Sequence, residues 1–190
     1  GLPIADSDDV LTQLADAVDE AQLEMRHIIA ERPDFQGMGT TVTAVCWQGD
    51  RASLAHVGDS RAYMLRDGQL LRLTKDHTYV QTLVDAGQIT EDEAATHRRR
   101  NLLIRAIDGV NTVEPDLSIR EVHPGDRIML CTDGLSGVLR DPEIHELLAR
   151  SDPPGAVTAQ SLASRRPVFV PRCPWGARPL REEHHGQHRG

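Results

Sequence analysis

Lysine is almost absent from this 190-residue chain: Lys75 is the only one, and every other basic residue except histidine is an arginine. The formal net charge is −8, so the chain has no basic surplus of the kind that attracts a nucleic-acid backbone. No apolar stretch approaches the length of a membrane-spanning helix. We therefore expect neither a nucleic-acid partner nor a membrane segment in this chain.

Cysteine is also scarce. Cys46, Cys131 and Cys173 are far apart, and their spacing forms neither a disulfide framework nor a zinc-binding pattern. An odd number of unmatched thiols is typical of a reducing compartment. The sequence therefore predicts a cytoplasmic protein.

What is present is the composition of a globular domain. Hydrophobic residues make up 39% of the chain and charged residues 26%, and a mass of 21.0 kDa is enough to form one core. Residues 161–190 differ, because they hold six arginines and four prolines without helical or strand periodicity. We expect one domain over residues 1–160 and a disordered arginine- and proline-rich tail over 161–190.

Periodicity and turn signals predict the order of the elements. Apolar residues recur at helical spacing over 8–31, and Asp67-Gly68 is a strong hairpin signal inside a run of strand-like segments. The predicted elements are a helix at 8–31, an antiparallel meander at 40–73, two short helices within 78–97 with Gly87 as a C-cap, strands at 117–123 and 127–134, and a helix at 142–150. Strands in meander order with helices before and after them indicate an α+β fold with antiparallel sheet.

Two aspartates stand out because each follows an apolar strand and lies beside glycine. They are Asp59 in HVGDS and Asp133 in LCTDG. Adjacent strands can bring two such carboxylates to one point, where a hard cation such as Mg²⁺ or Mn²⁺ relieves their repulsion. The alternative is turn chemistry, which accounts for Asp50, Asp67 and Asp126 elsewhere in the chain. Either aspartate alone leaves both interpretations open.

Five motifs in a fixed order go further. They are GMGTT at 37–41, HVGDSRAYMLRDGQL at 56–70, LTKDHT at 73–78, NLLIRA at 101–106 and PGDRIMLCTDGL at 124–135. In this order and spacing they resemble the PPM-type (protein phosphatase 2C-like) metal-dependent serine/threonine protein phosphatases, and specifically the bacterial members. The resemblance covers roughly residues 10–150.

The resemblance implies a fold, a reaction and a site. The fold is two stacked antiparallel β-sheets flanked by helices, an α-β-β-α sandwich. The reaction is hydrolysis of phosphoserine and phosphothreonine by a water bound to two Mn²⁺ or Mg²⁺ ions. Asp133 matches the family's core metal ligand and Asp59 matches a ligand of an additional metal. The partners would be phosphorylated proteins and a serine/threonine kinase, and residues 78–97 match the family's mobile flap.

The printed sequence also departs from the family pattern. It contains neither the N-terminal Arg, Asp and DGMGG-type motifs nor the C-terminal Gly-x-Asp-Asn motif, so we expect a sandwich that is incomplete at both ends. No catalytic residue beyond the metal ligands is predicted, and His77 and His97 are better explained by packing than by proton donation. The alternative function is a catalytically inactive module of the same fold that binds a phosphoprotein or a kinase.

Overall fold

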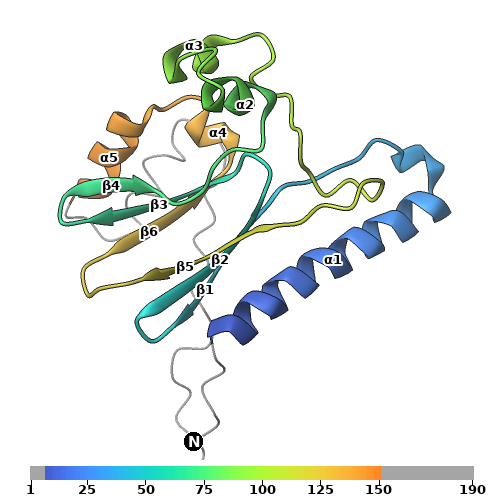
Figure 1. Cartoon of the computed structure of the whole chain (residues 1–190), viewed down its shortest axis with the longest axis horizontal. Coiled ribbons are helices and arrows are strands. Elements are labelled where there is room, and N and C mark those ends of the chain that lie inside the picture. Colours follow the sequence, from blue (N-terminus) through green and yellow to red (C-terminus); the bar gives the residue numbers. More distant parts are fainter. Residues whose placement is uncertain (1–6, 151–190) are drawn as a thin grey trace, which may run out of the picture.

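The computed structural model of the chain describes residues 7–150, which form six helices and six strands (Figure 1). The helices are α1 Ser7–Glu31, the 3-10 helix η1 Pro33–Phe35, α2 Tyr79–Asp85, α3 Glu91–Thr96, α4 Asp133–Ser136 and α5 Asp141–Ala149. The strands are β1 Val42–Gln48, β2 Arg51–Val57, β3 Arg61–Arg66, β4 Gln69–Arg72, β5 Asp116–Glu121 and β6 Arg127–Cys131.

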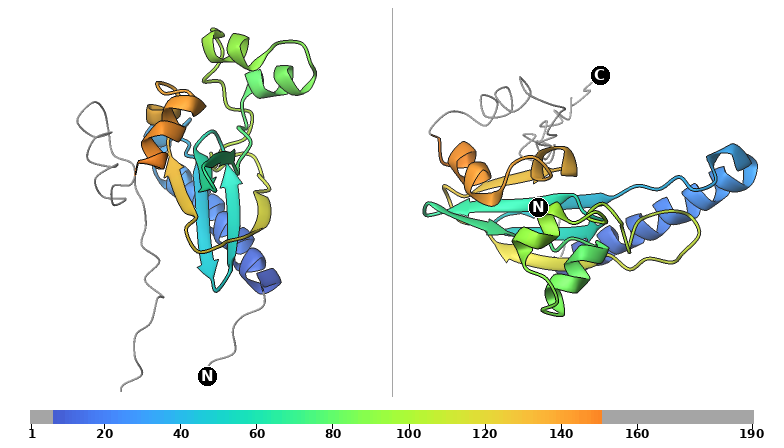
Figure 2. Two further views of the ribbon diagram at one scale, coloured as in Figure 1. Left: turned by 90° about the vertical axis from the view of Figure 1, so that its left-hand side faces the viewer. Right: turned by 90° about the horizontal axis from the view of Figure 1, so that it is seen from above.

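The strands form two three-stranded sheets, in the orders β1-β2-β5 and β4-β3-β6, with every neighbouring pair antiparallel. Helix α1 lies along the first sheet and α5 packs against the second (Figures 1 and 2). Three apolar clusters fill the spaces between these layers. The predicted α+β sandwich of two stacked sheets flanked by helices is therefore confirmed.

The two central strands, β2 and β3, are buried on both faces. Successive side chains of a strand point to opposite faces, so each strand contributes to two clusters. Leu54 of β2 and Ala62 of β3 lie in the cluster between the sheets. Val57 faces α1, and Tyr63 packs with α5. This double burial explains why both strands read as nearly continuous apolar runs in the sequence.

The structure corrects the predicted meander at 40–73. These residues form two separate hairpins, β1-β2 and β3-β4, because β2 pairs next with β5 and β3 pairs next with β6. The chain therefore passes from one sheet to the other at residues 58–60. A sequence pattern shows that strands follow one another, but it does not show which sheet each strand joins.

A second correction concerns the predicted strand at 127–134. Strand β6 ends at Cys131, and Asp133 is already the first residue of the short helix α4. The other predicted elements are present with ends shifted by a few residues, and Gly87 follows the Ala86 C-cap of α2 in the left-handed region. The NLLIRA segment forms no regular element and is joined to its neighbours by isolated bridges.

Two expectations concern residues that the structure does not describe. The boundary at residue 160 and the disordered tail over 161–190 both lie outside 7–150. Within the described part, no helix combines the length and the apolar character needed to cross a bilayer.

The pair between Arg66 and Asp126 joins β3 to the turn before β6 and makes stability depend on pH. Arg66 donates to both carboxylate oxygens at 2.6–3.2 Å and, with the backbone N–H of His123, lowers the pKa of Asp126 to about 2. Because this pKa lies below its unfolded value of 3.8, the stabilisation is complete above about pH 4 and is lost as the pH falls towards 2.

We expect Asp126→Asn to lower the free energy of unfolding by about 1–2 kcal/mol at pH 7. The difference between wild type and variant should shrink between about pH 4 and pH 2, as measured by urea unfolding at each pH. A difference that stayed constant over this range would contradict the assignment.

Candidate metal centre

The pairing of β3 with β6 brings the two predicted aspartates to the same end of the sandwich. Arg61 stands opposite Cys131 in this antiparallel pair. Asp59 precedes Arg61 by two residues and Asp133 follows Cys131 by two, so both lie just past the ends of the paired strands, and the charge of Asp133 acts on Asp59. We call this end, formed by residues 58–60 and 132–133, the carboxylate edge.

The two carboxylates repel each other. Asp59 is half-buried and Asp133 is exposed, and neither has a salt-bridge partner within the described residues. Burial raises the pKa of Asp59, and the negative charges of Asp133 and then of Asp76 raise it further. A bound divalent cation would relieve this repulsion, so the electrostatics of the edge fit a cation site.

At the carboxylate edge the backbone of residue 58 lies very close to Thr41, which is possible because residue 58 is glycine. Its φ is +109°, and a Cβ at this position would lie 2.3 Å from Cγ2 of Thr41. Its N–H donates to Nδ1 of His77 at 3.0 Å, and its carbonyl accepts from the N–H of His77 at 2.8 Å. Only glycine fits here, and its backbone is held by one residue through two hydrogen bonds.

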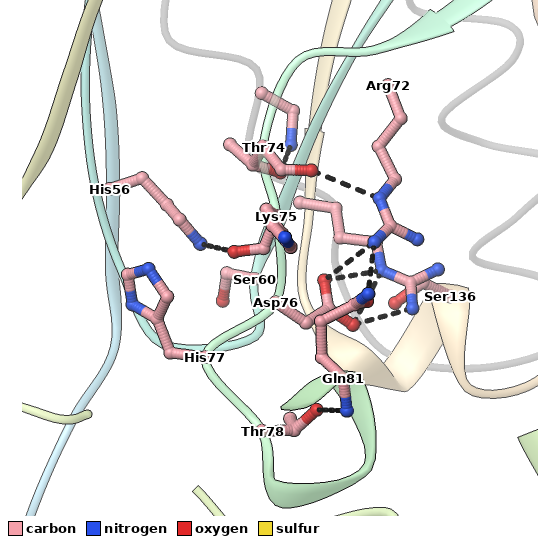
Figure 3. A network of polar contacts seen from close by, with 12 residues as sticks. His56, Ser60, Arg72, Thr74, Lys75, Asp76, His77, Thr78, Gln81 and Ser136 are labelled. Atoms are coloured by element: carbon pink, nitrogen blue, oxygen red, sulfur yellow. Dashed lines mark hydrogen bonds and ion pairs between the residues drawn. The ribbon is translucent and has the colours of Figure 1, made fainter. Parts of the chain in front are cut away.

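Threonines of the first sheet hold the next residue of the loop. The hydroxyls of Thr41 and Ser60 are 2.8 Å apart, and Thr43 Oγ1 lies 2.9 Å from the carbonyl oxygen of Ser60. Thr43 Oγ1 also lies 2.9 Å from Nδ1 of His56, whose Nε2 donates to the carbonyl of Lys75 (Figure 3). Residues on both sides of Asp59 are thus fixed to the sheet.

Arg61 fastens the end of the loop to the LTKDHT segment. Its Nε and Nη2 donate to the two carboxylate oxygens of Asp76 at 2.9 and 2.6 Å, a bidentate pair in which both side chains are largely buried. Its Nη1 lies 3.2 Å from the hydroxyl of Tyr63, which donates to Asp141 at the start of α5. Because Arg61 is fully occupied by these groups, it acts as a positioning residue for the edge.

Asp76 and its neighbours connect the edge to the flap helices. Arg72 Nη2 lies 3.9 Å from Asp76 and donates to Gln81 of α2 at 3.1 Å (Figure 3). The hydroxyl of Thr78 accepts from the backbone N–H of Gln81 and caps this helix. The root of the flap is therefore built from the same segment that holds Arg61.

His77 has a structural role, in agreement with the packing interpretation. Its Nδ1 accepts from the N–H of Gly58, and its Nε2 lies 3.0 Å from a carboxylate oxygen of Asp116 and 2.5 Å from Nη2 of Arg105. Burial lowers the pKa of His77 and the charge of Arg105 lowers it further, while Asp116 opposes both effects. Both ring nitrogens of the neutral imidazole are engaged, and neither is available to protonate a leaving group.

All five sequence motifs meet around the carboxylate edge. Thr40 of GMGTT and Ile107 exchange two backbone hydrogen bonds of 2.9 Å. In the NLLIRA segment, Leu103 forms a bridge with Thr78, and the N–H of Ile104 donates to the carbonyl of His77. The five motifs are spread along the sequence, but they lie together in the folded chain.

Sequence reasoning missed several residues that position the edge. Asp76 belongs to a quoted motif, but nothing in the sequence indicated that it pairs with Arg61. Tyr63, Asp116 and Asp141 come from three different elements and were not predicted to act at the site. Membership of a quoted motif, LTKDHT for Asp76 and HVGDSRAYMLRDGQL for Tyr63, was the signal that could have found two of these residues.

The donor set at the edge is small. Within residues 7–150, no group of three or more histidine, cysteine, aspartate or glutamate side chains is arranged to hold a metal. Asp59 and Asp133 supply two carboxylates, and a hard cation there would complete its shell with water or backbone oxygens. These residues fit one cation, and they do not by themselves make the two-metal set that the resemblance implies.

The fold and this edge define an α-β-β-α sandwich that presents two carboxylates beside a helical flap. The pattern of the protein phosphatase 2C family matches residues 3–168, and the chain belongs to this family. It is 49% identical over 140 residues to the serine/threonine protein phosphatase PstP of Mycobacterium tuberculosis, and 43% identical over 141 residues to a putative protein phosphatase 2C-type of Streptococcus pyogenes.

Solved structures agree with this assignment. The crystal structure of M. tuberculosis PstP/Ppp superimposes with a TM-score of 0.78 at 44% identity, covering 82% of this chain and 65% of that chain. The catalytic domain of PstP in complex with two manganese ions gives a TM-score of 0.72 at 45% identity, covering 82% and 64%. The matches cover 74% of this chain but 27% of the full PstP sequence, and 73% of this chain but 57% of the S. pyogenes protein.

We expect Gly58→Ala to destabilise the fold by about 3 kcal/mol, from about 1 kcal/mol of backbone strain and the clash with Thr41. Gly68→Ala is the matched control, because Gly68 also has a positive φ (+73°) but has open space around its Cβ position. It should cost only about 1 kcal/mol. Chemical denaturation of both variants measures the difference, and equal losses would mean that the close approach to Thr41 is not a constraint.

Asp76→Asn should lower the free energy of unfolding by about 2–4 kcal/mol, because it leaves the largely buried Arg61 without its counter-charge. The control is Asp85→Asn, which breaks the more exposed 2.7 Å pair with Lys75 and should cost less than about 1 kcal/mol. Thermal and urea unfolding of both variants check the order. A larger loss in the Asp85 variant would refute the positioning role of the Arg61–Asp76 pair.

Proposed function

We propose that this chain carries part of the catalytic domain of a metal-dependent protein serine/threonine phosphatase. Family membership and the named activities of the relatives support the reaction class. The observation that supports the proposal is that Asp59 and Asp133 adjoin the paired ends of β3 and β6, interact electrostatically and form no ion pair within residues 7–150. Two unpaired carboxylates at one edge are the arrangement that a hard cation needs.

In this proposal Asp133 and Asp59 hold Mn²⁺ or Mg²⁺. A bound ion of this kind supplies Lewis-acid activation of water and neutralises phosphoryl oxygens. The chain's own residues contribute rigidity: Gly58 and His77 fix the loop that bears Asp59, and α4 begins at Asp133. Arg61 is engaged by Asp76 and Tyr63, so we assign it to positioning the loop rather than to binding the phosphate. The Asp59 loop keeps its position without help from a substrate.

A second candidate is a module of the same fold that binds a phosphoprotein or a kinase without turnover. The observation in its favour is the small donor set, two carboxylates in the described part of the chain. Such a set binds Mg²⁺ or Mn²⁺ weakly, because these ions normally take several fixed oxygens. The two candidates differ in whether metal at the edge leads to hydrolysis.

The substrates that we propose are phosphoserine and phosphothreonine in proteins, with a serine/threonine kinase as the opposing enzyme. The names of the relatives, which are serine/threonine protein phosphatases of bacteria, support this choice. We also propose action in the cytoplasm, where the buried thiol of Cys131 would stay reduced.

The test is hydrolysis of a phosphothreonine peptide by the 190-residue chain with and without millimolar Mn²⁺. We expect Mn²⁺-dependent turnover that falls at least about a hundredfold in Asp133→Asn, since this change removes a charged inner-sphere ligand. The same variant should lose the rise in melting temperature that Mn²⁺ produces in the wild type.

The control is Asp67→Asn, a carboxylate change in the exposed β3-β4 turn, where asparagine tolerates the observed φ of 49°. It should keep both the turnover and the Mn²⁺-induced rise in melting temperature. Folded wild-type protein that gains stability from Mn²⁺ but hydrolyses nothing would reject the phosphatase in favour of the binding module. Absence of both effects would reject the metal site.

A further inference from the structure

Three consecutive arginines form an exposed turn directly after the flap helices. Arg98, Arg99 and Arg100 follow the C-terminus of α3, and all three side chains are exposed. Most other described arginines pair with a carboxylate or a carbonyl oxygen, but no carboxylate lies within 4 Å of these three in the part of the chain that the structure describes. We call residues 98–100 the arginine turn.

The arginine turn is held in one conformation by its own backbone and by an aromatic ring. The N–H of Arg99 donates to Nδ1 of His97, and the N–H of Arg100 donates to the carbonyl of the same residue. The guanidinium of Arg99 lies 5.7 Å from the centre of the Tyr79 ring. The three charges are therefore presented by a fixed segment, which lowers the entropy lost when a partner binds.

Acidic residues of the flap do not neutralise this turn. In α3, Glu93 caps its own helix through Thr90, and Asp92 pairs with Arg140 at 2.7 Å. Next to the arginine turn, Leu102 and Ile104 are 49% and 50% exposed. The surface thus combines three unpaired positive charges with two apolar side chains in a chain whose net charge is −8.

This surface lies beside the carboxylate edge. The N–H of Tyr79 donates to the carbonyl of Leu102 at 2.8 Å, and His77, two residues earlier, holds Gly58 of the edge. The flap and α4, which begins at Asp133, lie at the same end of the sandwich (Figures 1 and 2). An extended peptide with its phosphorylated residue at the edge could reach the arginine turn with its neighbouring residues, since each residue spans about 3.3 Å.

We propose that the arginine turn binds acidic side chains that flank the phosphorylated residue of a protein substrate, with Leu102 and Ile104 contacting apolar residues between them. This inference rests on the proposed function and specifies its substrate class as acidic phosphoproteins. Charge complementarity favours this partner, because arginine binds carboxylates bidentately. The arginine turn is positively charged in a chain whose net charge of −8 would otherwise repel an acidic segment. The same negative surface disfavours a nucleic-acid backbone.

The experiment measures binding rather than turnover, so that its result does not depend on the phosphatase proposal. A fluorescent 12-residue phosphothreonine peptide with aspartate and glutamate at the flanking positions is titrated with the 190-residue chain, and fluorescence anisotropy is followed at low salt. A second peptide carries lysine at the same flanking positions. We expect the acidic peptide to bind more tightly, and its affinity to fall as salt is raised to 0.5 M, roughly where charges are screened beyond ~4 Å.

The test variant is Arg98→Gln/Arg100→Gln, which spares Arg99 and its contact with Tyr79. Its affinity for the acidic peptide should fall about five- to tenfold, the effect of two exposed charge pairs. The charge control is Arg32→Gln/Arg120→Gln, which removes two arginines from exposed sites and should leave the affinity unchanged; Arg32 directly precedes η1 and pairs with Asp34, and Arg120 lies on β5. Circular dichroism melting of all three proteins establishes that they are equally folded.

Several results would overturn the proposal. Equal losses in the two double variants would mean that overall charge, not the arginine turn, attracts the peptide. An equal loss with the lysine-flanked peptide would mean that the arginines contact the phosphate itself. Tighter binding of a labelled single-stranded oligonucleotide than of the acidic peptide would assign the turn to nucleic acid. Selective binding without hydrolysis would uphold the proposal while rejecting the phosphatase.

Discussion

The close approach of Gly58 to Thr41 is the constraint on which the rest of the structure depends. At this point the chain leaves the first sheet and enters the second, so the stacking of the sheets and the location of the loop are fixed together. A residue with a side chain could not pass Thr41, and the loop would have to move outward. Asp59 would then move away from Asp133, and the two carboxylates could not share the cation that we propose.

Charges at this end of the sandwich fall into two groups. Asp76 and Asp116 are each engaged by an arginine, and their negative charge is used to hold β3, β5 and the segment before α2 together. Asp59 and Asp133 form no ion pair within residues 7–150, although Asp59 is half-buried. A buried charge without a partner is unfavourable and a bound cation would compensate it, which is why we propose a metal at this edge.

The sequence predicted the layers of the fold, and the physical reasons are local; the assignment of Asp59 and Asp133 as metal ligands stays a prediction. Helical spacing over 8–31, β-branched runs and Asp67-Gly68 act within a few residues, and the five motifs fixed the order of the elements. The sequence did not predict that β2 and β3 belong to different sheets, because sheet membership depends on β5 and β6, which are distant in the chain. The hydrogen bond of Tyr63 to Asp141 could not be predicted either, because the two residues lie far apart in the sequence.

The two ends of the flap are held differently: hydrogen bonds fix its root, and an exposed ion pair holds its outer end. Its root cannot shift without breaking the hydrogen bonds of His77 to Gly58 and the helix cap at Thr78. Its outer end is joined to the body by an exposed ion pair between Asp92 and Arg140, which contributes at most about 1 kcal/mol. The weak outer contact therefore concerns α3, whereas the arginine turn is held next to the root by His97, Tyr79 and Leu102. A peptide that binds the arginine turn thus meets a fixed surface beside the fixed loop that carries Asp59.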